Sequence, residues 1–100
     1  MNKRTKNYAE KIVEVVKNFQ PIIKAVIVGN AVHEDFSFDE NIKLAVFTTP
    51  ETKISTTCIE LNNALGEKDL YNIDIYMMAD EDFYMEVHDL LDDGEVIFER

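Results

Sequence analysis

The 100-residue sequence is poor in the residues that cross-link or stiffen a small domain, with one cysteine, two prolines, three glycines and no tryptophan. A disulfide needs two thiols and a thiolate zinc cluster needs several, so the single Cys58 excludes both within the chain. A reducing, cytoplasmic location is consistent with this composition. The fold must be stabilised by a hydrophobic core, which the 46% hydrophobic content can build.

Basic residues are also scarce, since 10 Lys and Arg face 20 Asp and Glu and the formal net charge is -10. A protein that binds nucleic acid needs basic side chains to replace the counterions of the phosphates. We therefore expect no direct binding to DNA or RNA. An acidic surface favours solubility and rapid encounter with a basic protein partner.

Long apolar runs are absent as well. No run approaches the roughly 20 residues that cross a bilayer, and the basic start at residues 1–6 leads into an amphipathic segment rather than an apolar signal core. The sequence predicts a soluble, untargeted cytoplasmic protein without a membrane partner. Its length predicts one domain, residues 1–100.

Hydrophobic periodicity predicts the order helix, strand, strand, helix, strand, helix, strand. The expected ranges are 7–19, 22–28, 42–47, 50–65, 70–78, 80–93 and 96–98. Asn7 and Glu10 have capping-box spacing for the first helix, Thr49-Pro50 is expected to begin the second, and Gly66 is expected to end it. Cys58 falls on the second helix's apolar stripe and is predicted to be a core residue.

Connection lengths predict the topology of the sheet. Only a dozen residues without helical pattern join the first two strands, which favours an antiparallel pair, whereas the helix at 50–65 allows a parallel crossover to the third strand. The predicted fold is therefore α/β in the α+β sense, a small mixed sheet of about four strands with helices packed on it. In the second strand, Lys43 is expected on the opposite face from the core residues Ile42 and Leu44.

The segment after the first strand carries a family resemblance. It reads Gly29-Asn30-Ala31-Val32-His33-Glu34-Asp35-Phe36-Ser37-Phe38-Asp39-Glu40-Asn41-Ile42-Lys43-Leu44. The third strand contains Asn72-Ile73-Asp74-Ile75-Tyr76, and the chain closes with Asp93-Gly94-Glu95-Val96-Ile97-Phe98-Glu99. Over nearly its whole length this arrangement resembles the polymerase-β-like minimal nucleotidyltransferase domains, which implies a nucleotidyltransferase-like fold.

The resemblance also shows where the chain departs from the family, whose members carry Gly-Ser after the first strand, Asp-x-Asp entering the second and a further Asp in the third. Gly29 matches. Asn30 stands where the family has a serine expected to contact phosphate, while Asn41 and Lys43 stand where it has the metal-binding pair. Only Asp74 keeps its carboxylate. The resemblance implies a degenerate member with no catalytic residues, no metal and no cofactor.

These substitutions change the charge of the expected metal site. Two divalent ions held by carboxylates stabilise the attacking and leaving oxygens of such reactions, but lysine offers three donors and no acceptor. Replacing three carboxylates by Asn41, Lys43 and Asp74 moves the site from about -3 to about 0. Like charges about 4 Å apart repel by roughly 4 kcal/mol at an effective dielectric of 20. We predict that Lys43 replaces the metal's charge and pairs with Asp74; the alternative is that Lys43 extends into solvent.

The first functional hypothesis is a pseudoenzyme that binds a protein. Small domains of this family often pair with a helical partner of the HEPN type in toxin–antitoxin systems, so the resemblance implies an antitoxin-like role with a small basic helical protein. The acidic face of the helix at 80–93 offers a docking surface for it.

Two alternatives remain open. One is a divergent nucleotidyltransferase that transfers a nucleotide from an NTP, with Mg²⁺ held by Asp74 together with Asp39 or Glu40. The other is nucleotide binding without turnover, through Asn30 and the backbone amides that follow Gly29.

Overall fold

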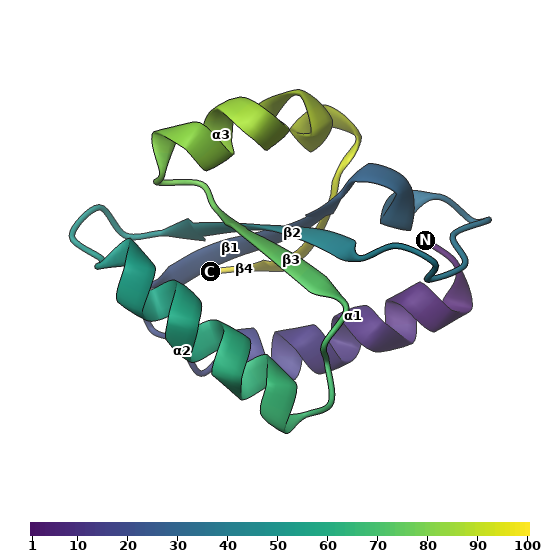
Figure 1. Ribbon diagram of the computed structural model, residues 1–100, viewed down its shortest axis with the longest axis horizontal. Coiled ribbons are helices and arrows are strands. Elements are labelled where there is room, and N and C mark those ends of the chain that lie inside the picture. Colours follow the sequence, from purple (N-terminus) through teal and green to yellow (C-terminus); the bar gives the residue numbers. More distant parts are fainter.

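The computed structural model describes all 100 residues, Met1–Arg100. The elements are α1 (Lys3–Val16), β1 (Ile22–Val28), the 3-10 turn η1 (Gly29–Val32), β2 (Ile42–Thr48), α2 (Ile54–Glu67), β3 (Ile73–Met77), α3 (Glu81–Val87), the 3-10 turn η2 (His88–Asp93) and β4 (Glu95–Glu99). They form a four-stranded mixed sheet with three helices packed on it (Figure 1). The predicted α+β fold class is confirmed. No helix is both long and apolar enough to cross a bilayer.

The strands lie side by side in the order β3-β2-β1-β4. β1 and β2 are antiparallel, and β2 and β3 are parallel through the α2 crossover, as their connections predict. β4 returns antiparallel to β1 on the other side. In Figure 1, α1 and α2 cover one face of the sheet, and α3 with η2 covers the other.

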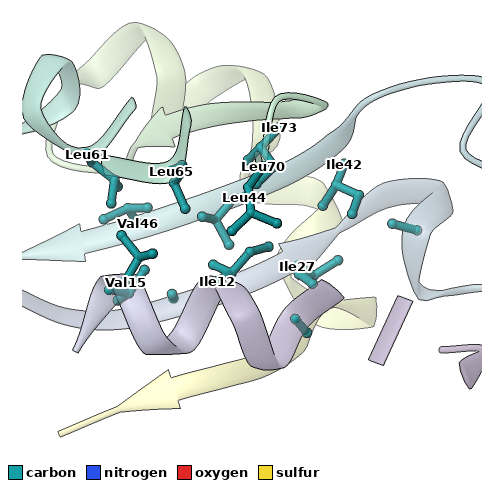
Figure 2. Packing of buried hydrophobic residues seen from close by; sticks show 14 of the residues in the cluster. Ile12, Val15, Ile27, Ile42, Leu44, Val46, Leu61, Leu65, Leu70 and Ile73 are labelled. Carbon is teal, nitrogen blue, oxygen red and sulfur yellow. The ribbon is translucent and has the colours of Figure 1, made fainter. Parts of the chain in front are cut away.

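The larger core fills the space between the sheet and the pair α1 and α2 (Figure 2). The side chains labelled there are Ile12, Val15, Ile27, Ile42, Leu44, Val46, Leu61, Leu65, Leu70 and Ile73. All ten are buried, and each contributes about 1.5–3 kcal/mol relative to exposure. The face of β2 predicted to be core is the one that packs here.

A smaller core lies on the opposite face, beneath α3 and η2. Its buried members are Val26, Val28, Ala45, Met78 and Val87. Ala45, which strand alternation places on the same face as Lys43, is fully buried there, so this face of β2 also contributes to a core. At Gly94 the backbone packs so closely on β1 that a side chain would not fit, since an added Cβ would lie 2.7 Å from Val26 Cγ1.

The predicted starts of the first two helices are wrong. α1 begins at Lys3 and is capped by Asn2 rather than Asn7. α2 begins at Ile54, and Thr49-Pro50 belongs to the preceding turn. The Thr49 N–H donates to the Pro21 carbonyl at 3.0 Å, which extends the pairing of β1 with β2. The Thr49 carbonyl accepts from the Thr52 N–H at 3.1 Å within that turn.

The end of α2 also differs from the prediction. The helix continues past Gly66 to Glu67, and Asp69 takes the left-handed conformation with φ of 60°. The Asp69 N–H donates to Gly66 O and the Leu70 N–H to Leu65 O, the two bonds of a Schellman motif. Asp tolerates this conformation better than most residues. The buried pair Leu65 and Leu70 gives the motif its hydrophobic contact.

The third strand and the last helix are shorter than predicted. The strand predicted at 70–78 spans Ile73–Met77, and the helix predicted at 80–93 divides into α3 and η2. The cap at Asp80 is confirmed, since its Oδ1 accepts hydrogen bonds from the N–H groups of Asp82 and Phe83.

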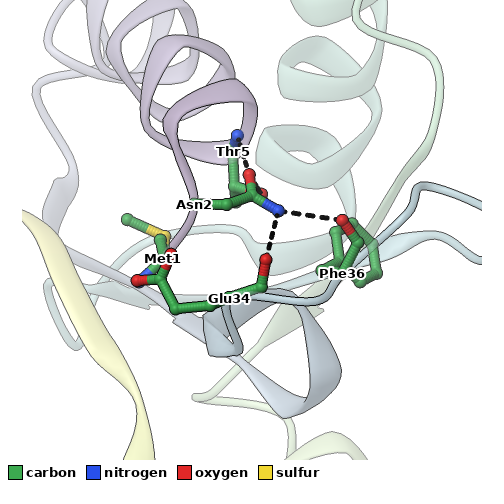
Figure 3. Close-up of polar contacts among 5 residues, drawn as sticks. All are labelled: Met1, Asn2, Thr5, Glu34 and Phe36. Atoms are coloured by element: carbon green, nitrogen blue, oxygen red, sulfur yellow. Dashed lines mark hydrogen bonds and ion pairs between the residues drawn. The ribbon is translucent and has the colours of Figure 1, made fainter.

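One side chain joins α1 to the loop between η1 and β2 (Figure 3). Asn2 Oδ1 accepts from Thr5 N and Thr5 Oγ1, both at 2.8 Å, which caps the helix. Asn2 Nδ2 donates to the carbonyls of Glu34 at 3.1 Å and Phe36 at 2.8 Å. The amide therefore serves two elements through its two ends.

We predict that Asn2→Asp lowers the free energy of unfolding by about 1–2 kcal/mol, because it keeps the cap acceptor but loses both donors to the loop. Asn2→Ala loses the cap as well and should cost about 2–3 kcal/mol. Urea denaturation measures both. The exposed Asn7→Asp, the same change within α1, should stay within about 0.5 kcal/mol of the wild type. Equal stability of Asn2→Asp and the wild type would contradict the role of the donors.

Candidate functional site

The positions identified by the family resemblance meet at one end of the sheet. Gly29 follows the last residue of β1, Lys43 lies near the start of β2, and Asp74 lies near the start of β3. Because β1 and β2 are antiparallel and β2 and β3 are parallel, these three strand ends are adjacent. In the register, Lys43 is opposite Val28 on one side and opposite Asp74 on the other.

Gly29 has a φ of 77°, in the left-handed region that favours glycine. A Cβ added there would lie 3.5 Å from Lys43 Cδ. The aliphatic stem of Lys43 therefore runs across Gly29, which explains why Lys43 is only partly exposed. The prediction that Gly29 ends the first strand is confirmed.

The predicted ion pair between Lys43 and Asp74 does not form. The ion pairs of the chain all join other residues. Instead, Asn41 Nδ2 donates to Asp74 Oδ1 at 3.0 Å. Both partners are exposed, and an exposed ion pair gains little while it orders a long side chain. The shorter amide satisfies the carboxylate at a lower cost in conformational entropy.

The loop positions are also engaged within the chain. Asn30 Nδ2 donates to Glu40 Oε1 at 2.8 Å, so the residue expected near a phosphate contacts a carboxylate. Asp39 and Glu40 line a polar pocket of about 380 Å³ that also contains Asn30 and His33. The alternative metal ligands Asp39, Glu40 and Asp74 are not assembled, since no three acidic, His or Cys side chains gather as a potential ion site.

The residues at the strand ends do not fit Mg²⁺, which takes hard oxygen ligands and usually binds through carboxylates. Asp74 is the only carboxylate among the three positions, and the nitrogen of Asn41 is turned toward it. Lys43 adds a positive charge on the neighbouring strand, in register with Asp74. The formal charges of Lys43 and Asp74 cancel, so these two side chains together exert no net attraction on a divalent cation.

Tyr76 is a site residue that the sequence analysis did not identify. Burial raises the pKa of its hydroxyl, and the negative charges of Glu86 and Asp74 raise it further. Its ring meets Phe83 edge to face, with centroids 5.7 Å apart. Strand alternation already places Tyr76 on the same face as Asp74, but only the packing of α3 on the sheet brings Glu86 near. Tyr76 therefore lies close enough to Asp74 and Glu86 for their charges to act on its hydroxyl.

No protein-family model matches this chain, and no curated protein matches its sequence. The resemblance to nucleotidyltransferases stays a prediction from the residues.

We predict that Tyr76→Phe reduces the loss of stability at alkaline pH. The pKa of Tyr76 is raised in the folded protein above the ordinary value of 10.0. The unfolded chain therefore releases this proton first, and stability falls as pH rises from the unfolded toward the folded pKa. Urea denaturation between about pH 9 and 11.5 should show a shallower decline for Tyr76→Phe. Tyr71→Phe, at a side chain 70% exposed, should keep the wild-type slope; parallel slopes for Tyr76→Phe and the wild type would refute the prediction.

Proposed function

We propose that this chain is a nucleotidyltransferase-like domain that has lost its metal site and acts as a pseudoenzyme, binding a protein partner in an antitoxin-like role. The hydrogen bond from Asn41 to Asp74 is the observation that carries this proposal. It occupies the one carboxylate that the family pattern retains, and it comes from the position where the first metal ligand would stand.

Lys43 supports the loss of catalysis. Nucleotidyl transfer depends on divalent cations that neutralise charge on the attacking and leaving oxygens. An ammonium group in register with Asp74 repels such cations, and it cannot coordinate them because it has no lone pair. Lys43 and Asp74 together therefore form a neutral pair of charges and not a cation-binding site.

The charge of the chain supports a basic protein partner. The net charge is -10, and α3 exposes Glu81, Asp82 and Glu86 without a lysine or arginine on the helix. Electrostatic attraction would steer a positively charged partner toward this side of the molecule during diffusional encounter. A small, basic, helical protein of the HEPN type, as the resemblance implies, has the complementary charge.

We predict that Asn41→Asp combined with Lys43→Asp restores a cation site. The double variant places three carboxylates, including Asp74, at the adjacent strand starts, and it should bind Mn²⁺ at least about tenfold more tightly than the wild type by calorimetry. Adding Asp74→Ala to the double variant should abolish the gain. Transfer of labelled nucleotide by the wild type, lost in Asp74→Ala, would overturn the proposal in favour of a divergent enzyme.

We also predict that the gene neighbouring this one encodes a small, all-helical, basic protein, and that the two products co-purify when expressed together. Because the association is driven partly by opposite charges, the complex should weaken as salt is raised above physiological ionic strength. Size-exclusion chromatography at two salt concentrations measures this. A co-expressed neighbour that elutes separately at low salt would argue against the partner.

A further inference from the structure

A second concave surface lies at the other end of β3 from Asp74. β3 is an edge strand, so the two helical layers approach each other around it where no further strand intervenes. In Figure 1 the first turns of α2 and α3 lie at the same end of the sheet, on opposite faces. Between them is a pocket of about 560 Å³. This volume lies within the range of ligand-binding pockets and admits several side chains.

The lining of this pocket is mainly apolar. Its hydrophobic members come from three elements and are Ile54, Cys58, Ile59, Met77 and Phe83. Ile59 is 62% exposed, although it belongs to a helix whose other large apolar side chains face the core. A single exposed isoleucine is ordinary. Ile59 differs in that it extends the apolar lining of a concave surface.

Asp80 is the one charged residue in the lining of the pocket, and Lys53 lies between the lining residues Thr52 and Ile54. Asp80 uses only its Oδ1 to cap α3, so its second carboxylate oxygen has no partner in the chain. The first turn of α3 continues with Glu81 and Asp82, and neither α3 nor its cap carries a basic residue. A second copy of this chain, also at -10, would be repelled from this surface.

We propose that this pocket is the docking site for a cationic amphipathic helix of a partner protein, which inserts its apolar side chains between α2 and α3 and places lysine or arginine beside Asp80. An amphipathic helix lays apolar anchors one turn apart into a hydrophobic groove, which suits a concavity bounded by two helices. This docking site names the surface that binds the partner and the chemistry of the partner helix. It rests on the proposed partner-binding function.

Cys58 provides the test, because the chain's only thiol lines the pocket. The probe is a capped peptide of about 14 residues with leucine at helical spacing and lysine at the other positions. A matched peptide carries glutamate in place of every lysine. Burial raises the pKa of the Cys58 thiol, so its alkylation is followed at about pH 9. The lysine peptide should bind and slow alkylation about tenfold at nine-tenths saturation; the glutamate peptide should do neither.

Three variants assign the binding to the pocket. Ile59→Ser, at an exposed position, should weaken binding about tenfold or more. Asp80→Asn keeps the cap acceptor and removes the charge, and it should weaken binding by about two- to fivefold. Val96→Ser, at a 49% exposed position on the opposite edge strand, is the matched control and should bind as the wild type does.

Several outcomes overturn the assignment. These are failure of the lysine peptide to bind, binding that leaves Cys58 alkylation unchanged, equal effects of Ile59→Ser and Val96→Ser, and protection of Cys58 by dimers of the chain itself. The complex with the neighbouring gene product separates this failure from failure of the proposed function. If that complex forms while Cys58 stays reactive, partner binding stands and the pocket assignment falls.

Discussion

The central position of β2 is the constraint on which the rest of the structure depends. It is paired on both edges, antiparallel with β1 and parallel with β3, and its middle is buried on both faces by Leu44 and Ala45. A strand confined on four sides can present functional groups only at its ends. The start of β2 is one such end, and the adjacent start of β3 and end of β1 make it a meeting point of three strands.

Three asparagine side chains at this end of the molecule donate hydrogen bonds to oxygen atoms of the chain. Asn2 donates to two carbonyls of the loop, Asn30 donates to Glu40, and Asn41 donates to Asp74. Each bond gives an oxygen a neutral donor in place of a positive charge. Because an amide carries both a donor and an acceptor, Asn2 can also cap α1 with its other end. The loop is therefore held in part by hydrogen bonds within the chain.

The candidate site and the apolar pocket lie at opposite ends of the same short strand. Asp74 is near the start of β3, Met77 ends it, and Asp80 follows; the extended residues between Asp74 and Met77 span roughly 10 Å. The edge-to-face contact of Tyr76 with Phe83 connects the two, since Tyr76 lies near Asp74 and Phe83 lines the pocket. A helix bound in the pocket would therefore lie against α3, whose Phe83 contacts Tyr76.

Local patterns in the sequence determined the elements and their pairing. Alternation and connection length were enough to predict β1, β2, the antiparallel first pair and the parallel crossover, because these depend on side-chain period and on the span of a linker. Gly29 and Asp80 were also assigned correctly, since a left-handed turn and a helix cap depend on the residue itself. The absence of the Asp-x-Asp pair was equally visible in the residues.

Only the tertiary structure decided which polar groups meet. Asn2 replaced Asn7 as the cap of α1 because the distant carbonyls of Glu34 and Phe36 bind its amide. Asn41 took the place of Lys43 at Asp74 because side-chain reach, and not strand register alone, selects a partner. The pocket at Ile59 arises where two helical layers converge beyond an edge strand. Such contacts join residues far apart in the chain, and no local periodicity encodes them.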